Sequence, residues 1–167
     1  MDKWLDQLET DLAALITEHQ ELLGLIRRKK EAMTQAKTRV VADCCQMENE
    51  HVQRIAQTEK HRQQVVAAIT EAINAEAKEP LTMEEIAGRV PEPRRGRLLV
   101  RRQQLRVLMQ TIKSENDVAR RITEGLLRHV QGMIQQVTLA VGAAGTYGRK
   151  GITAAPAIAV SSFVVSG

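Results

Sequence analysis

Apolar side chains recur every three or four residues along most of this chain, which is the spacing of an amphipathic α-helix. The longest run extends from about Pro93 to Val141. About 45 residues at ~1.5 Å each predict a rod of roughly 65–70 Å. A helix of that length cannot bury its own apolar row, so we expect the rest of the chain, or another chain, to cover it. Its first heptad positions are Leu98, Leu105, Ile112, Ala119, Leu126, Met133 and Ala140, and its fourth positions are Arg101, Leu108, Glu115, Ile122, His129 and Gln136. All of the first positions are apolar, but only Leu108 and Ile122 are apolar among the fourth, so the seam is imperfect.

The N-terminal part of the chain contains two further helical patterns. The first runs from Leu5 to Met33, and the second, with a more polar seam, runs from Val41 and ends near Ala77. No proline or capping glycine separates them, so we place a bend at residues 34–38, where the first apolar row stops. The alternative is one continuous helix of about 75 residues, which would need a partner helix along its whole length.

Local signals divide the rest of the chain. Pro80 cannot continue a helix, and Thr82 with Glu85 forms a capping box that begins a short helix ending near Gly88. The glycine-rich sequence at 142–145 predicts the end of the long helix, and the uncharged residues 152–167 are expected to be disordered. The sequence therefore predicts an all-α fold, an elongated antiparallel bundle of about three long helices and one short one over residues 1–141, followed by a flexible tail over residues 142–167.

Composition narrows the possible classes of protein. The 167 residues include one Trp, one Tyr and one Phe, which argues against a β-sandwich or a large globular enzyme. The net charge of +4 is modest and mostly interspersed. No apolar stretch reaches the ~18 residues of a membrane span, so we expect no stable membrane insertion. The N-terminus has no secretory signal pattern, which favours a cytoplasmic protein with reduced thiols at the adjacent Cys44 and Cys45.

Candidate metal sites are incomplete. Glu48 and His51 have the Glu-x-x-His spacing of di-iron bundles, but no second copy of that motif is present. Cys44, Cys45 and His51 lack a fourth ligand at a zinc-like spacing. His19 and His129 occupy seam positions and are interpreted as residues that set helix register. We expect no catalytic residue, no metal and no cofactor, and hence a protein that is not an enzyme.

A dense basic run follows the short helix. It could resemble a helix-turn-helix, in which a capped helix precedes a basic recognition helix. Pro91 and Pro93 in the turn, and the great length of the next helix, argue against nucleic-acid binding. The simpler interpretation is a solvated face or a positive patch for an acidic protein. The run consists of Arg89, Arg94, Arg95, Arg97, Arg101, Arg102 and Arg106.

The last third of the long helix carries a second apolar row beside the heptad seam, which widens its apolar face. Either two neighbouring helices cover this face inside the protein, or it is a binding surface for a partner helix. Across the two rows, the residues that we expect to bind a partner are Leu126, Leu127, Val130, Met133, Ile134 and Val137.

The chain resembles the FlgN family of flagellar export chaperones over about residues 1–151. Three features carry the resemblance: the order of the helices, the pattern around Leu105, Arg106 and Asn116, and the motif Tyr147-Gly148-Arg149-Lys150-Gly151. That motif is similar to the Tyr-Gly-x-x-Gly that follows the last helix in the family. The tail from Ile152 onward and the two cysteines are not part of the resemblance.

The resemblance implies a cytoplasmic chaperone for the proteins of the hook–filament junction. Such a chaperone binds the C-terminal region of these subunits, prevents premature assembly and delivers them to the type III export gate. Carried over by position, Tyr147, Gly148 and Gly151 would contact the export gate component, and the apolar face of the long helix would bind the subunit. A structural coiled-coil protein that only self-associates is the alternative, and a DNA-binding protein that uses the region from Arg89 to Arg106 is the less favoured one.

Overall fold

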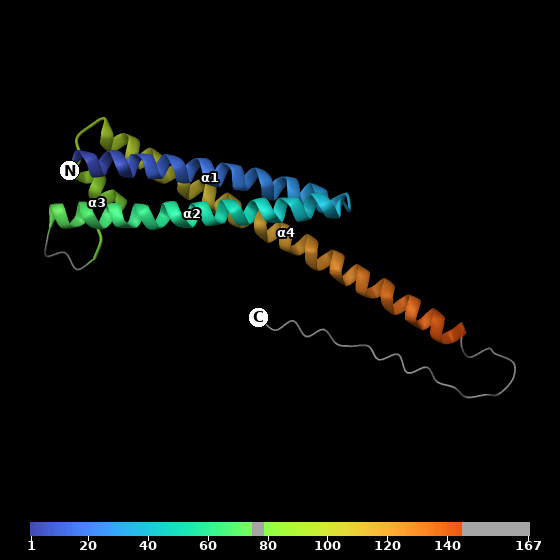
Figure 1. Cartoon of the computed structure of the whole chain (residues 1–167). Helices are drawn as coiled ribbons and strands as arrows, with labels where there is room; N and C mark the ends of the chain where they lie inside the picture. The colour runs from blue at the N-terminus through green and yellow to red at the C-terminus, as the bar shows by residue number, and fades with distance from the viewer. Residues whose placement is uncertain (75–78, 145–167) are drawn as a thin grey trace. The chain divides into compact units, whose positions relative to one another are not determined.

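The computed structural model describes residues 1–74 and 79–144, with side chains as far as Ala140, and every regular element among them is a helix (Figure 1). The all-α fold with three long helices and one short one is therefore confirmed. The elements are α1 (Asp2–Thr34), α2 (Thr38–Ile73), α3 (Met83–Gly88) and α4 (Arg94–Ala144). Residues 1–126 form one compact unit and residues from Leu127 onward form a second, and each is described by itself.

The bend between α1 and α2 lies where the sequence predicts it. Ala36 adopts a left-handed φ of 54° just after the helix end. The amide of Lys37 donates to the carbonyl of Ala32 at 2.9 Å, and the amide of Ala36 donates to the carbonyl of Met33 at 3.2 Å. These two bonds form a Schellman motif, which ends a helix and reverses the chain without a proline. Glycine is the usual residue at this left-handed position, but here it is Ala36. The sequence therefore indicates the bend only by the interruption of its apolar row.

The segment between α2 and α4 is organised by local hydrogen bonds. α2 ends at Ile73, short of the predicted end near Ala77, which lies outside the described residues. The capping box is confirmed: Glu85 donates its amide to the Thr82 hydroxyl, and the Thr82 amide donates to the Glu85 carboxylate. α3 then places Ile86 and Ala87 in the hydrophobic core. That core comprises Leu5, Leu8, Leu12, Val65, Val66, Ile69, Ile86, Ala87 and Leu98.

α1 and α2 are antiparallel, whereas α4 runs parallel to α1 within the first unit. Three hydrogen-bonded pairs of side chains join α1 to α4, and the two residues of each pair are 88 positions apart. The pairs are Asp6 with Arg94, Glu9 with Arg97, and Arg27 with Glu115. A constant separation along two helices requires that they run in the same direction. α2 returns the chain to the end of the bundle where α1 begins, and the connection through α3 stays at that end, so α4 starts beside the start of α1 (Figure 1).

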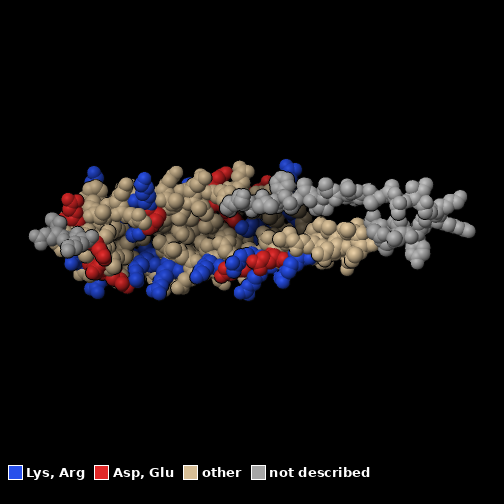
Figure 2. Space-filling model, turned by 90° about the horizontal axis from the view of Figure 1, so that it is seen from below, with Lys and Arg blue, Asp and Glu red and all other residues tan. Residues whose placement is uncertain are grey.

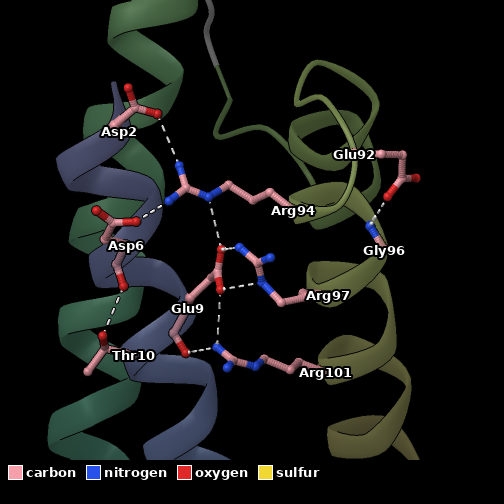
Figure 3. Close-up of polar contacts among 9 residues, drawn as sticks. All are labelled: Asp2, Asp6, Glu9, Thr10, Glu92, Arg94, Gly96, Arg97 and Arg101. Atoms are coloured by element: carbon pink, nitrogen blue, oxygen red, sulfur yellow. Dashed lines mark hydrogen bonds and ion pairs between the residues drawn. The ribbon is translucent and has the colours of Figure 1, made fainter.

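Glu9 holds the start of α4 against α1 (Figure 3). Its carboxylate accepts hydrogen bonds from Arg94 at 3.0 Å and from Arg97 at 3.1 and 3.2 Å. Arg101 donates to the backbone carbonyl of Glu9 and forms an ion pair with its carboxylate at 3.7 Å. The interpretation of the arginines as a solvated face is therefore incomplete for these three: Arg94 and Arg101 are only partly exposed, Arg97 is exposed, and all three pair with Glu9 of α1, which is not a neighbour in sequence.

The apolar row of α4 changes from buried to exposed along the helix. Leu98 is fully buried and Ala119 is 5% exposed, but Leu126, seven residues further on, is 46% exposed. Two polar interruptions of the seam have partners on α1: Arg101 pairs with Glu9, and Glu115 pairs with Arg27 and Lys30. α4 ends at Ala144, within the glycine-rich sequence at 142–145 that was predicted to end it, although Gly142 itself is still helical. Glycine lowers helix propensity by only about 1 kcal/mol and does not by itself end a helix.

We predict that Ala36→Gly stabilises the protein by about 1 kcal/mol, because glycine has no Cβ to resist the left-handed conformation. Ala14→Gly, at an exposed site within α1, is the matched control and should lower stability by about 1 kcal/mol. Urea unfolding followed by circular dichroism measures both. A destabilising Ala36→Gly would contradict the Schellman geometry.

A second prediction concerns pH. Hydrogen bonding to Arg97, with the charges of Arg97, Arg94 and Arg101, holds the pKa of Glu9 below its ordinary value of 4.5, although burial opposes this shift. A lowered folded-state pKa stabilises the protein above the unfolded pKa, and the contribution is lost as pH falls through the folded pKa. Glu9→Gln should therefore cost about 2 kcal/mol at neutral pH, and the difference from the native chain should shrink as pH falls below 4.5.

Glu50→Gln, which changes an exposed carboxylate on α2, is the control for the Glu9 experiment and should alter stability by less than about 0.5 kcal/mol at either pH. Urea unfolding at neutral pH and in acid gives both differences. If the cost of Glu9→Gln does not change with pH, the carboxylate of Glu9 does not carry the interaction.

Candidate functional site

The last turns of α4 display the apolar face that the sequence predicts. We call Leu126, Leu127, Val130, Met133, Ile134 and Val137 the C-terminal stripe. Leu126 closes the first unit and the other five belong to the second. Val130, Ile134 and Val137 follow one another at spacings of four and three residues, so they share one face of the helix.

Every side chain of the C-terminal stripe is exposed, from 45% for Val130 and Met133 to 63% for Val137. Large apolar side chains at this spacing are normally buried, and a contiguous exposed set is typical of an interaction surface. Leu139 is even more exposed, at 73%, but it lies on another side of the helix, so periodicity does not place it in the stripe. The role of the stripe in binding stays a prediction.

Charge is nearly absent from this part of α4. Between Gly125 and Ala144 the sequence contains no Asp, Glu or Lys and a single Arg, Arg128. Figure 2 agrees, because the end of α4 that adjoins the grey atoms shows neither blue nor red on the face in view. Because the C-terminal stripe has few charged neighbours, it would have to recognise a partner by shape and apolar contact more than by charge.

The predicted export-gate residues Tyr147, Gly148 and Gly151 lie outside the described residues, as does the tail from Ile152 to Gly167. α4 ends at Ala144, two residues before the Thr-Tyr-Gly sequence begins. The role of Tyr147 therefore stays a prediction.

The basic run does not present a free basic recognition face. Arg94, Arg97 and Arg101 pair with acidic groups of α1, and Arg102 pairs with Glu84 of α3 at 2.8 Å. Four of the seven arginines thus hold the first unit together. This arrangement does not favour the helix-turn-helix interpretation, in which these side chains would contact phosphates.

The structure does not bring together the metal-binding candidates that the sequence suggested. Glu48 pairs with Lys29, whereas His51 contacts Glu18 at 2.7 Å. The set that could hold a metal is Glu18, Glu21 and His51, which sequence spacing missed because the residues come from two helices. Arg54, however, donates to both oxygens of Glu18 at 3.0 and 3.1 Å and already neutralises that carboxylate. Burial raises the pKa of Glu18, but its hydrogen bonds to His51 and Arg54 outweigh this effect and leave the pKa below its ordinary value.

The two cysteines are unpaired, with Cys44 buried and Cys45 exposed. Burial raises the pKa of the Cys44 thiol, which makes it less reactive as a thiolate. Neither cysteine joins a possible metal-binding group within the described residues. None of the helices in the described ranges is both long enough and apolar enough to span a bilayer.

Comparison with known proteins gives one match. The family model described as FlgN protein matches residues 1–155, which include all four helices, the C-terminal stripe and Tyr147. A search of the curated proteins and a search of the solved structures each found no match. Because the family match covers nearly the whole chain, this chain belongs to the FlgN family of flagellar export chaperones.

Proposed function

We propose that this chain is a cytoplasmic chaperone that binds the C-terminal region of the hook–filament junction proteins. Binding keeps that region from assembling early, and the complex is then delivered to the export gate. Membership of the FlgN family supports the class of function. The observation that carries the finer proposal is the exposure of the C-terminal stripe on a helix whose earlier heptad row is buried at Leu98 and Ala119 and partly buried at Leu105 and Ile112.

The stripe has the properties needed to replace a subunit's own coiled-coil partner. Its residues repeat at helical spacing, so a second helix can pack along them by inserting its side chains between them. Each side chain is about half exposed, so covering it contributes roughly 1 kcal/mol, about half the value of full burial. Six such contributions, reduced by the entropic cost of association, are consistent with reversible binding and later release.

Delivery is assigned to a different part of the chain. Tyr147 follows α4 closely in sequence, with Gly148 and Gly151 beside it, and the family match extends past it. A tyrosine supplies a large apolar ring and a hydroxyl in one side chain, which suits recognition by a second protein. Subunit binding and gate binding would thus use adjacent but separate surfaces, and neither needs a catalytic residue or a cofactor.

The first test changes the stripe. Ile134 is 60% exposed, so Ile134→Asp should leave folding stability within about 0.5 kcal/mol. It should weaken binding of a junction protein by about tenfold or more, because a charge would be placed in the apolar contact. Isothermal titration of the full chain with each purified junction protein measures the affinity.

Val100→Asp is the matched control, since Val100 is 56% exposed on the first half of α4 and lies outside the stripe. Its affinity for the subunit should equal that of the native chain. Equal losses in both variants would show that the stripe is not the binding surface. A chain that binds no junction protein but sediments as a stable oligomer would instead be a self-associating structural protein.

The second test separates delivery from binding. Tyr147→Ala should leave the affinity for the junction protein unchanged while it reduces capture by the export gate component and lowers secretion of the subunit. Titration, pull-down with the purified gate component and secretion from cells give the three readouts. If subunit affinity falls as much as gate capture, Tyr147 belongs to the subunit site and the assignment fails.

A further inference from the structure

A second apolar surface lies entirely within the first unit, away from the C-terminal stripe. Two adjoining hollows of about 580 and 450 Å³ open between α2 and α4, with α1 as their floor. Both are lined by His19, Ile55 and Met109, so they form one continuous feature, which we call the groove. Sequence reasoning did not find it because its walls come from segments about fifty residues apart in the chain.

The groove is apolar at its floor and partly open at its walls. Leu12 and Leu15 of α1 form the floor and are fully buried. Val52 of α2 and Met109 of α4 stand in the walls and are 52% and 54% exposed. Along α4 the lining extends from Arg102 to Asp117, and fifteen residues at ~1.5 Å give a length of about 22 Å, or roughly four helical turns.

Some charged side chains at the edge of the groove have an ion-pair partner and two basic ones do not. Arg62 pairs with Glu59, Arg102 with Glu84, and Asp117 with Arg120. Arg106 and Lys113 also line the groove, but they make no ion pair with any residue that the structure describes. They lie seven residues apart on α4, so both project to the same side of the helix, on either side of Met109.

We propose that the groove binds an amphipathic helix of a partner protein, whose apolar face covers Val52 and Met109 and whose acidic side chains pair with Arg106 and Lys113. The length of the groove and its apolar floor fit a helix of about four turns. The two unpaired cations select acidic side chains at its edge. The C-terminal stripe of a second copy would fit the groove poorly. Between Gly125 and Ala144 it has no acidic side chain to pair with Arg106 and Lys113, and its one charged side chain, Arg128, is itself basic.

This inference goes beyond the proposed chaperone function, because the groove is a surface separate from the stripe. The test uses two fluorescent synthetic peptides of three heptads, about 21 residues, with leucine at the first and fourth heptad positions. One peptide carries glutamate at the flanking fifth and seventh positions, and the other carries lysine there. Binding to the full chain is measured by fluorescence anisotropy at low and high salt.

The native chain should bind the glutamate peptide about tenfold or more tightly than the lysine peptide, and added salt should reduce that preference. The double variant Arg106→Glu/Lys113→Glu should reverse the preference. Met109→Asp should weaken both complexes by about tenfold or more, because it places a charge in the apolar wall. All of the altered side chains are exposed, and circular dichroism confirms that each variant is folded.

Two controls make the result specific. Lys3→Glu/Arg39→Glu changes the net charge by the same amount at exposed sites outside the groove and should keep the native preference. Ile134→Asp in the C-terminal stripe should keep the native preference for the glutamate peptide over the lysine peptide, because the uncharged stripe does not distinguish the two.

Equal affinity for the two peptides, or loss of binding in Ile134→Asp but not in Met109→Asp, would overturn the proposal. Sedimentation of the free chain as a dimer that Arg106→Glu/Lys113→Glu dissociates would also overturn it, because the groove would then be an interface between copies of this chain.

Discussion

The length of α4 relative to the helix beside it determines where this chain is buried and where it is exposed. α1 has 33 residues and α4 has 51, and the hydrogen-bonded pairs Asp6–Arg94 and Arg27–Glu115, near the two ends of the contact, are both 88 positions apart. At this register the end of α1 at Thr34 falls beside Ile122, and both residues line the same hollow. The apolar row of α4 continues past that point, and its side chains are exposed from Leu126 onward. The C-terminal stripe thus belongs to the part of α4 whose positions have no counterpart in α1 at this register.

Charged side chains fix the register that creates this mismatch. Glu9 binds three arginines at the start of α4, and Glu115 binds Arg27 and Lys30 near the end of α1. Both carboxylates have lowered pKa values because of these cations: Arg97 has the largest effect on Glu9 and Lys30 on Glu115. Apolar contacts alone would permit α4 to slide by one heptad along α1, whereas specific charge pairs at two separate points make that shift unfavourable.

Interactions between residues within one helical turn could be predicted from the sequence, whereas contacts between residues far apart in the chain could not. Thr82 and Glu85 are three residues apart, and their capping box was predicted correctly. The pairing of Arg97 with Glu9 was not predicted because Glu9 lies 88 residues earlier. Glu18 and His51, and the walls of the groove, were hidden for the same reason. The C-terminal stripe could be predicted because six apolar residues on a single helix need no knowledge of the fold.

The proposed function places partner binding on residues 126–137 of α4, and this is the central claim. Hydrogen–deuterium exchange of the full chain, free and with a bound junction protein, tests it most directly, since helix amides exchange more slowly when a partner restricts their opening. The account predicts new protection across residues 126–137 on binding, with little change in α1 and α2. Protection confined to α1 and α2, with residues 126–137 exchanging as in the free chain, would contradict it.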